Sequence, residues 1–154
     1  MKFWLLLMVA FGFGSSVAQP VRLTPQQIAL YVDAAQVEVI VAAPVLRVPE
    51  VADALRRASA KRGIGVKVLT GAESLRDAAS YFWVLKLAGA EVRTVSSVKG
   101  FELILDRRTR ITGDVIGRVL GPDELVPTTL EHQARGYAKE LLAVWLKAKV
   151  ATGF

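Results

Sequence analysis

The stretch VPEVADALRRASAKRGIGVKVLT, Val48–Thr70, predicts a helix that is followed directly by a strand. Apolar residues recur at helical spacing over Glu50–Arg62, and arginines and a lysine occupy the opposite face. Gly63 then stands where helices commonly end in a left-handed residue. Val66–Leu69 follows as a short apolar run rich in valine, which is typical of a buried strand. This helix–strand step is the basis for predicting the rest of the fold.

Two more helix–strand steps flank this one. A capping box at Thr24–Gln27, with Pro25 at the first helical position, begins a helix that leads into a buried strand over Gln36–Ala42. Another helix over Ala72–Leu87 leads into a strand over Glu91–Val95. Successive helix–strand steps favour parallel pairing, so we expect an α/β fold in which helices pack against a sheet.

The pattern changes after residue 95. Short strands are predicted over Phe101–Leu105, Thr109–Thr112 and Val115–Leu120. The polar turn Asp106–Arg110 makes the first two of these strands a hairpin.

The chain ends in a predicted long helix, which Thr128 or Thr129 would cap. Its expected inner face consists of Leu130, Ala134, Tyr137, Leu141, Val144 and Ala148. The sequence has no internal repeat and no low-complexity linker. We therefore expect a single domain over residues 19–154, a layered sandwich of a mixed, mainly parallel β-sheet flanked by helices.

The first residues resemble a secretory signal. Lys2 gives a charged start, Phe3–Phe13 is apolar, and Ser16-Val17-Ala18 has the small-x-small pattern of a cleavage site. The apolar run falls short of the roughly 20 residues that a membrane-spanning helix needs. We expect residues 1–18 to be a signal peptide cut after Ala18, with an uncleaved anchor as the alternative. The mature chain would be exported to the periplasm or the external medium, without stable insertion in the membrane.

Composition excludes several kinds of site. The chain has no cysteine, which excludes disulfides, a lipid-modified cysteine and cysteine metal sites. Its single histidine, His132, excludes imidazole metal clusters. In the predicted last helix His132 points away from the apolar face, as a surface residue does. We predict neither a metal nor a cofactor.

The net charge is modestly positive. Removal of Lys2 with the signal lowers it from +6 to +5. This excess favours anionic partners such as nucleic acid, phospholipid headgroups or acidic polymers, although a charge of this size is also common in proteins that are merely soluble.

Two stretches, VPEVADALRRASAKRGIGVKVLT and LKLAGAEVRTV, resemble the phospholipase D superfamily. Its members similarly have a helix that closes in Arg-Gly, a Val-x-Val strand and a step of the type Ala-Gly-Val-Glu-Val. The resemblance extends from about Pro25 to Gly117 and implies a phospholipase D-like fold. The family motif is His-x-Lys, four residues and Asp, followed after a turn by Gly-Ser-x-Asn.

The register of this motif can be set on the hairpin. Asp106 on the motif aspartate places Lys99 on the histidine and Phe101 on the lysine. The second part of the motif then falls on Gly113 for glycine, Asp114 for serine and Ile116 for asparagine.

The residue types at these positions argue against catalysis. In the family the histidine attacks phosphorus, and a histidine from a second motif protonates the leaving oxygen. A lysine at position 99 is charged at neutral pH and is therefore a poor nucleophile. Phe101 cannot neutralise phosphate, Ile116 cannot donate a hydrogen bond, and an ionised Asp114 would repel an anion. The resemblance implies the fold, and the residues predict a degenerate site.

The resemblance also implies a homodimer. Short exported members of the family carry one motif per chain and complete the site across a two-fold axis, which would place two Lys99 side chains near that axis. Strand alternation predicts one face with Lys99, Phe101, Leu103 and Leu105, and an opposite face with Glu102, Ile104 and Asp106. We hypothesise that Lys99 and Asp114 form an internal ion pair at the former phosphate position.

Three arginines, Arg107, Arg108 and Arg110, lie on the hairpin turn. With Lys99 they are the candidates for binding an anionic polymer through its phosphates, although a solvated turn is an equally good reading.

Three functions remain open. The favoured one is a non-catalytic, dimeric binding or scaffold module for anionic partners that contain phosphodiesters. The second is an active phosphodiesterase, of nuclease or phospholipase D type, with an atypical site or with a histidine from a partner chain. The third is an unrelated exported α/β binding domain.

Overall fold

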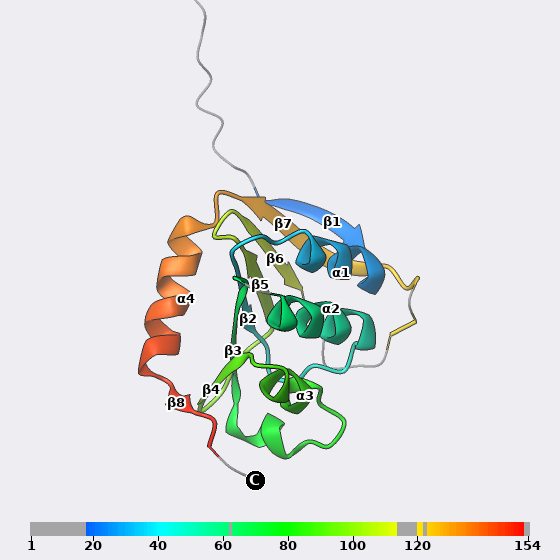
Figure 1. The fold of residues 1–154 in the computed structure, drawn as a ribbon. Helices are drawn as coiled ribbons and strands as arrows, with labels where there is room; N and C mark the ends of the chain where they lie inside the picture. The colour runs from blue at the N-terminus through cyan, green and yellow to red at the C-terminus, as the bar shows by residue number, and fades with distance from the viewer. Residues whose placement is uncertain (1–17, 62, 114–119, 122, 153–154) are drawn as a thin grey trace, which may run out of the picture.

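The strands of the helix–strand steps form the centre of one eight-stranded sheet with the order β1-β7-β6-β5-β2-β3-β4-β8 (Figure 1). The computed structural model describes residues 18–152 except residues 62, 114–119 and 122. Its elements are β1 (Gln19–Leu23), α1 (Pro25–Asp33), β2 (Glu38–Ala42), α2 (Pro49–Ala60), β3 (Gly65–Gly71), a 3-10 helix η1 (Ala72–Arg76), α3 (Phe82–Leu87), β4 (Glu91–Val95), β5 (Phe101–Leu105), β6 (Thr109–Gly113), β7 (Val126–His132), α4 (Arg135–Lys147) and β8 (Lys149–Val150).

The sheet is mixed, as predicted. β2, β3 and β4 pair in parallel, which confirms the inference from the helix–strand steps. The predicted hairpin is also present, because β5 pairs antiparallel with β6. The expectation that the sheet is mainly parallel is wrong: among the described strands, two pairings are parallel and five are antiparallel. β5 and β6 follow one another without a helix between them, and such short connections give antiparallel neighbours.

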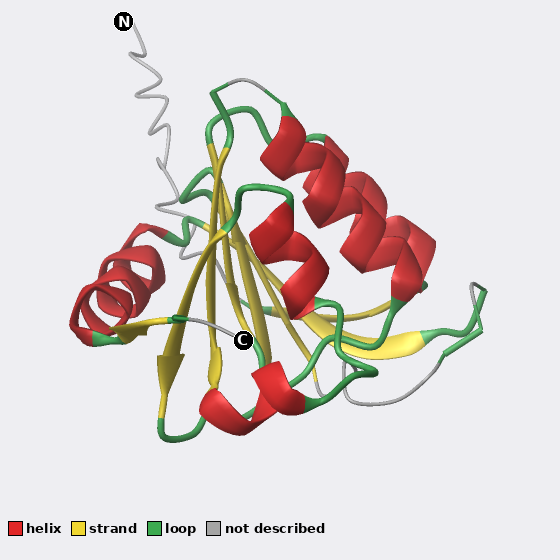
Figure 2. Ribbon diagram, turned by 60° about the horizontal axis from the view of Figure 1, so that its bottom comes forward, coloured by secondary structure: helices red, strands yellow, loops and turns green. Residues whose placement is uncertain are grey.

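Helices cover both faces of this sheet. α1, α2 and α3 lie on one face and α4 lies alone on the other, as Figure 2 shows from the end of the layers. All five residues of β2 are buried, as expected of a strand between two helical layers. The larger core, between the sheet and the first three helices, includes Val32, Leu55, Phe82 and Leu103. The smaller core packs Ala138, Leu141 and Trp145 of α4 against Ile40 and Ile104.

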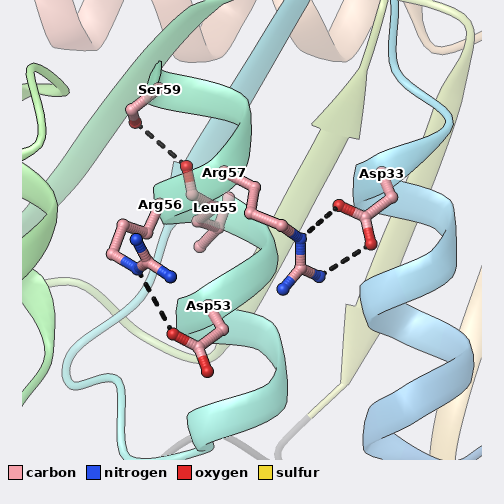
Figure 3. Close-up of polar contacts among 6 residues, drawn as sticks. All are labelled: Asp33, Asp53, Leu55, Arg56, Arg57 and Ser59. Carbon is pink, nitrogen blue, oxygen red and sulfur yellow. Dashed lines mark hydrogen bonds and ion pairs between the residues drawn. The ribbon is translucent and has the colours of Figure 1, made fainter. Parts of the chain in front are cut away.

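The first two helices are also joined at their outer ends. Arg57 of α2 donates two hydrogen bonds, of 3.1 and 2.7 Å, to the carboxylate of Asp33 at the end of α1 (Figure 3). The predicted capping box is present: the N–H of Gln27 donates to the Thr24 hydroxyl, and the Gln27 side chain accepts from the Thr24 N–H. None of the helices in the described residues has both the length and the apolar character needed to cross a bilayer.

The last helix begins later than predicted. Thr128, Thr129 and Leu130 belong to β7, and Gln133 has a φ of 71°, which no right-handed helix can include. The later start rotates the buried face, so that Tyr137 and Val144 are exposed while Ala138 and Trp145 are buried.

Other boundaries also differ. The helix expected over Ala72–Leu87 is split into η1 and α3, because the Asp77 carboxylate accepts the N–H of Ala79 in the turn between them. β1 was not expected at all. The strand expected over Val115–Leu120 lies outside the described residues except for Leu120, which is buried and belongs to no strand.

Candidate functional site

β5 connects two opposite edges of the sheet. It runs antiparallel to β2, so that Phe101 lies where the parallel strands end and Asp106 lies where they begin. We call these the carboxyl edge and the amino edge. At about 3.3 Å per residue, the length of β5 separates Phe101 from Asp106 by roughly 16 Å. The motif positions on the two sides of β5 therefore belong to different surfaces.

The carboxyl edge holds the start of the motif. Phe101 is 4% exposed and packs in the larger core, as do Leu103 and Leu105, so the predicted common face of these three residues is confirmed. Gly113 lies directly opposite Phe101 in the hairpin, so two of the motif positions meet. A buried phenyl ring at this point offers nothing to a phosphate anion.

Lys99 is placed differently from the prediction. It is exposed and precedes β5, because Gly100 has a φ of 72° and interrupts the extended backbone. Lys99 therefore does not continue the strand alternation of Phe101, and the predicted face that the two residues share is wrong. Asp114 and Ile116 lie outside the described residues, so the ion pair of Lys99 with Asp114 stays a prediction.

The amino edge is organised by Asp106. Its carboxylate accepts hydrogen bonds from the backbone N–H groups of Gln36, Val37 and Glu38, at 2.9, 2.8 and 3.0 Å. Burial alone would raise the pKa of Asp106, but these three donors outweigh it and hold the pKa below its ordinary value. The motif aspartate thus ties the end of β5 to the start of β2.

The turn that carries Asp106 has an unusual backbone. Asp106 and Arg107 have φ values of 51° and 56°, the left-handed region that tight hairpin turns use. The N–H of Arg108 closes the turn onto the carbonyl of Leu105 at 2.9 Å. Aspartate tolerates this region better than most residues do, which suits it to the first of these positions.

A buried carboxylate accompanies the turn. Glu38 is 7% exposed, and its two oxygens accept from Lys67 and Arg107, each at 2.9 Å. Burial raises the pKa of Glu38, but the hydrogen bonds of Arg107 and Lys67 outweigh it, so the pKa lies below the ordinary value. The positive charge of Arg107 is therefore partly neutralised by Glu38.

Arg110 is neutralised more fully. It donates to Glu102 at 2.7 Å and to Glu131 at 3.2 Å, and its guanidinium lies 3.8 Å from the ring centroid of Tyr137. These contacts occupy the group that was expected to bind an anion. Arg108 differs from the other two turn arginines, because it is exposed and forms no ion pair with any described residue.

α4 adds basic residues to this edge that the sequence interpretation did not include. The N–H of Ala134 donates to the carbonyl of Arg108 at 3.1 Å, which fixes the start of α4 beside the turn. Arg135 and Lys139, one helical turn apart, then line a depression of about 700 Å³ together with Arg108. Their four-residue spacing within the predicted last helix was the available signal, but nothing in the sequence places that helix beside the β5–β6 turn.

His132 is exposed, as predicted, but it lies at the end of β7 and not on a helix. It lines a second depression of about 700 Å³ with Arg108 and Arg135. The one imidazole of the chain is thus at the amino edge, away from Phe101 and Gly113.

Comparison with known proteins defines the class of this fold. No protein-family model matches the sequence, and no curated protein sequence matches it. Solved structures do match, and they give this chain the fold of the phospholipase D superfamily.

Two similar structures are bacterial. One is Nuc from Salmonella typhimurium, a phospholipase D family member, with a TM-score of 0.68 and 16% identity over 89% of this chain and 99% of that chain. The other is NucT from Helicobacter pylori, with a TM-score of 0.68 and 13% identity over 88% and 99%. The archaeal chromatin protein TrmBL2, described by its novel mode of DNA binding, matches with a TM-score of 0.56 and 16% identity over 90% of this chain and 55% of that chain.

Proposed function

We propose that this protein is an exported phospholipase D-like domain without catalysis, which acts as a dimeric binding or scaffold module for anionic partners that contain phosphodiesters. The observation that carries the proposal is the burial of Phe101 at the position of the motif lysine. A side chain that packs in the core cannot neutralise the non-bridging oxygens of a phosphodiester.

The placement of the other groups supports the loss of catalysis. A phosphodiesterase of this type needs a nucleophile and a proton donor within one site, on opposite sides of the same phosphorus atom. The nearest described cation to Phe101 along the chain is Lys99, which is exposed, whereas a nucleophilic lysine is desolvated or lies beside another cation. His132 lies at the opposite edge of the sheet. The carboxylate of Asp106 already accepts hydrogen bonds from three backbone N–H groups.

The anionic partner is supported by the amino edge and by the similar proteins. Arg108, Arg135 and Lys139 are exposed cations around one depression. TrmBL2 binds DNA, and Nuc is a phospholipase D family member. A partner of the same general chemistry, a chain or surface of phosphodiesters, fits these three cations. The homodimer rests on the family resemblance, and the carboxyl edge is its expected interface.

The test is an assay of hydrolysis and binding on one preparation. The full chain is expressed, purified as the host processes it, and incubated with a generic phosphodiester and with DNA. We expect no turnover, and we expect retention of a phosphodiester-containing anion that weakens as salt is raised. Turnover that disappears in Lys99→Ala or in His132→Ala would overturn the non-catalytic assignment.

Asp106→Ala is unsuitable as the catalytic control, because the structure gives Asp106 three backbone contacts and its loss would unfold part of the chain. Lys99→Ala and His132→Ala change exposed side chains and leave the core intact. Sedimentation of the same preparation tests the dimer. A strict monomer would remove the dimeric part of the proposal.

A further inference from the structure

The amino edge carries a basic surface that the family motif does not include. We call it the basic face and define it by Arg108, Arg135 and Lys139. Three depressions, of about 360, 700 and 700 Å³, meet at Arg107 and Arg108 and extend from the start of β2 to Leu146 near the end of α4. The basic face is therefore one continuous, hollowed surface rather than three separate cations.

The basic face carries an excess of positive charge. None of its three members forms a direct ion pair within the described residues, although Asp106 lines two of the depressions and interacts electrostatically with Arg108. Asp106 and Glu38 are the two carboxylates that line the three depressions, against the five cations Lys67, Arg107, Arg108, Arg135 and Lys139. An anion from outside the chain would thus meet more positive than negative charge.

The position of these cations on α4 costs stability. Arg135 is the first residue of α4, where the helix dipole disfavours a positive charge, and no side chain caps this helix. Basic residues at the amino end of a helix do not stabilise that helix. Their placement fits a surface that binds an anion near the free N–H groups.

Exposed aliphatic side chains flank the basic face on both sides. Val37, 65% exposed, lines the depression at the start of β2, and Leu146, 66% exposed, lines the depression along α4. Among the described residues, the imidazole of His132 is the one aromatic ring that lines the three depressions, so successive bases of a single strand would have no series of rings to stack on. Cations with aliphatic neighbours are the composition of a surface that rests on a lipid headgroup layer.

The chain enters the fold at this same edge. Gln19 pairs with Leu130, two residues before the end of β7, so the start of β1 lies beside the β5–β6 turn and the amino end of α4 (Figure 1). In the sequence, only residues 14–18 separate the apolar stretch Phe3–Phe13 from β1. A membrane contact of that stretch, during export or as a retained anchor, therefore brings the basic face toward the lipid headgroups.

We propose that the basic face binds the surface of a membrane rich in anionic phospholipids, peripherally and without insertion of the folded domain. This inference rests on the proposed function and names its partner: the phosphodiester anions are those of lipid headgroups. The carboxyl edge then points away from the bilayer and stays free for a second copy of the chain.

The experiment compares three forms of the full chain. All three are purified in the same way, so that residues 1–18, where they are retained, contribute equally to membrane binding. They are the wild type, the basic-face variant Arg108→Ala/Arg135→Ala/Lys139→Ala, and a matched control, Arg22→Ala/Arg76→Ala/Lys149→Ala, which removes the same charges from exposed positions elsewhere. Co-sedimentation is measured with vesicles of phosphatidylglycerol and phosphatidylcholine in equal parts and with vesicles of phosphatidylcholine alone. Retention of a short DNA duplex is measured in parallel, and circular dichroism verifies that all three forms are folded.

We expect the wild type to bind the anionic vesicles in preference to the neutral ones. Each removed cation should weaken binding about fivefold, so that the basic-face variant binds of the order of 100-fold more weakly and the matched control nearly as well as the wild type. Leu146→Ser should give a smaller, severalfold loss.

Equal binding of anionic vesicles by the basic-face variant and the wild type would overturn the inference. Retention of DNA that depends on the basic face, without preference for anionic vesicles, would overturn the lipid assignment and leave the proposed function standing. Failure to bind either vesicles or DNA would overturn both.

Discussion

The carboxyl edge and the amino edge of the sheet hold the two ends of the predicted motif, and they differ in how their residues are used. At the carboxyl edge, the apolar ring of Phe101 belongs to the core. At the amino edge, the carboxylate of Asp106 binds the backbone of β2. The difference teaches that an aspartate at a motif position can have a role in folding that is independent of catalysis.

The largest expected effect is at the carboxyl edge. Phe101→Ala should lower the free energy of unfolding by about 4 kcal/mol, because it leaves a cavity in the larger core. Urea denaturation measures it, and Phe101→Met, which keeps most of the volume, is the matched control with a loss below about 1.5 kcal/mol. A loss under 1 kcal/mol for Phe101→Ala would mean that the ring is not packed and that the edge is still an open site.

The next effect is at the amino edge. Asp106→Ala should lower the free energy of unfolding by about 3 kcal/mol, because three backbone N–H groups lose a charged acceptor and alanine disfavours the left-handed φ. Asp106→Asn keeps an oxygen acceptor and tolerates that φ, so its loss should be clearly smaller. If both variants were as stable as the wild type, the structural reason for retaining Asp106 would be lost.

Acid should weaken the amino edge. The pKa values of Asp106 and Glu38 lie below their ordinary values of 3.8 and 4.5 in the folded protein. Their contribution to stability is therefore fully present above these ordinary values and is lost as the pH falls through the lower folded-state values. Urea denaturation at a series of pH values should show stability declining below about pH 4.

The free energy of unfolding that is lost when Asp106 is protonated cannot exceed the loss caused by Asp106→Ala. Asp106→Asn, which has no proton to take up, should show a flatter decline than the wild type. Parallel profiles for the two proteins would show that the carboxylate of Asp106 is not held in its charged form by the fold.

The smallest effect distinguishes the exposed part of the carboxyl edge from its buried part. Lys99→Ala should change the free energy of unfolding by no more than about 0.5 kcal/mol, because Lys99 is exposed in a loop. Thermal unfolding is sufficient to measure it, with Phe101→Ala as the positive reference. A loss above 1.5 kcal/mol would indicate that Lys99 has a partner in the folded protein, as the hypothesis of an ion pair with Asp114 requires.

Periodicity predicted the parts of the fold that local sequence determines. The helix and strand of Val48–Thr70 and the β5–β6 hairpin follow from amphipathic spacing and turn residues, and both are present. β1 was missed because its partner, β7, is more than 100 residues away and no local pattern marks the pairing. The last helix was begun too early because Thr128 and Thr129 suit both a helix cap and a strand.

The site was predictable in part for the same reasons. Alternation of Phe101, Leu103 and Leu105 correctly predicted one common face, and this face proved to be core. The role of Asp106 could not be read from the sequence, because its three donors are backbone groups about 70 residues earlier in the chain. The basic face combines a hairpin turn with a helix that begins far along the sequence, and the pairing of Thr109 with His132 and the hydrogen bond from Ala134 to Arg108 bring them together.

The pairing of β1 with β7 constrains the order in which the chain can fold. The Thr128 hydroxyl donates to the carbonyl of Val21 across a separation of 107 residues. During synthesis, which runs from the amino end, β1 is made early but has no partner strand until β7 has been made as well. The sheet is therefore completed only after most of the chain has been made, and β1 must stay unpaired until then. Pro20, the second residue of β1, suits a strand that stays unpaired for some time. Proline has no N–H to donate to a neighbouring strand, and it therefore limits premature pairing with other chains.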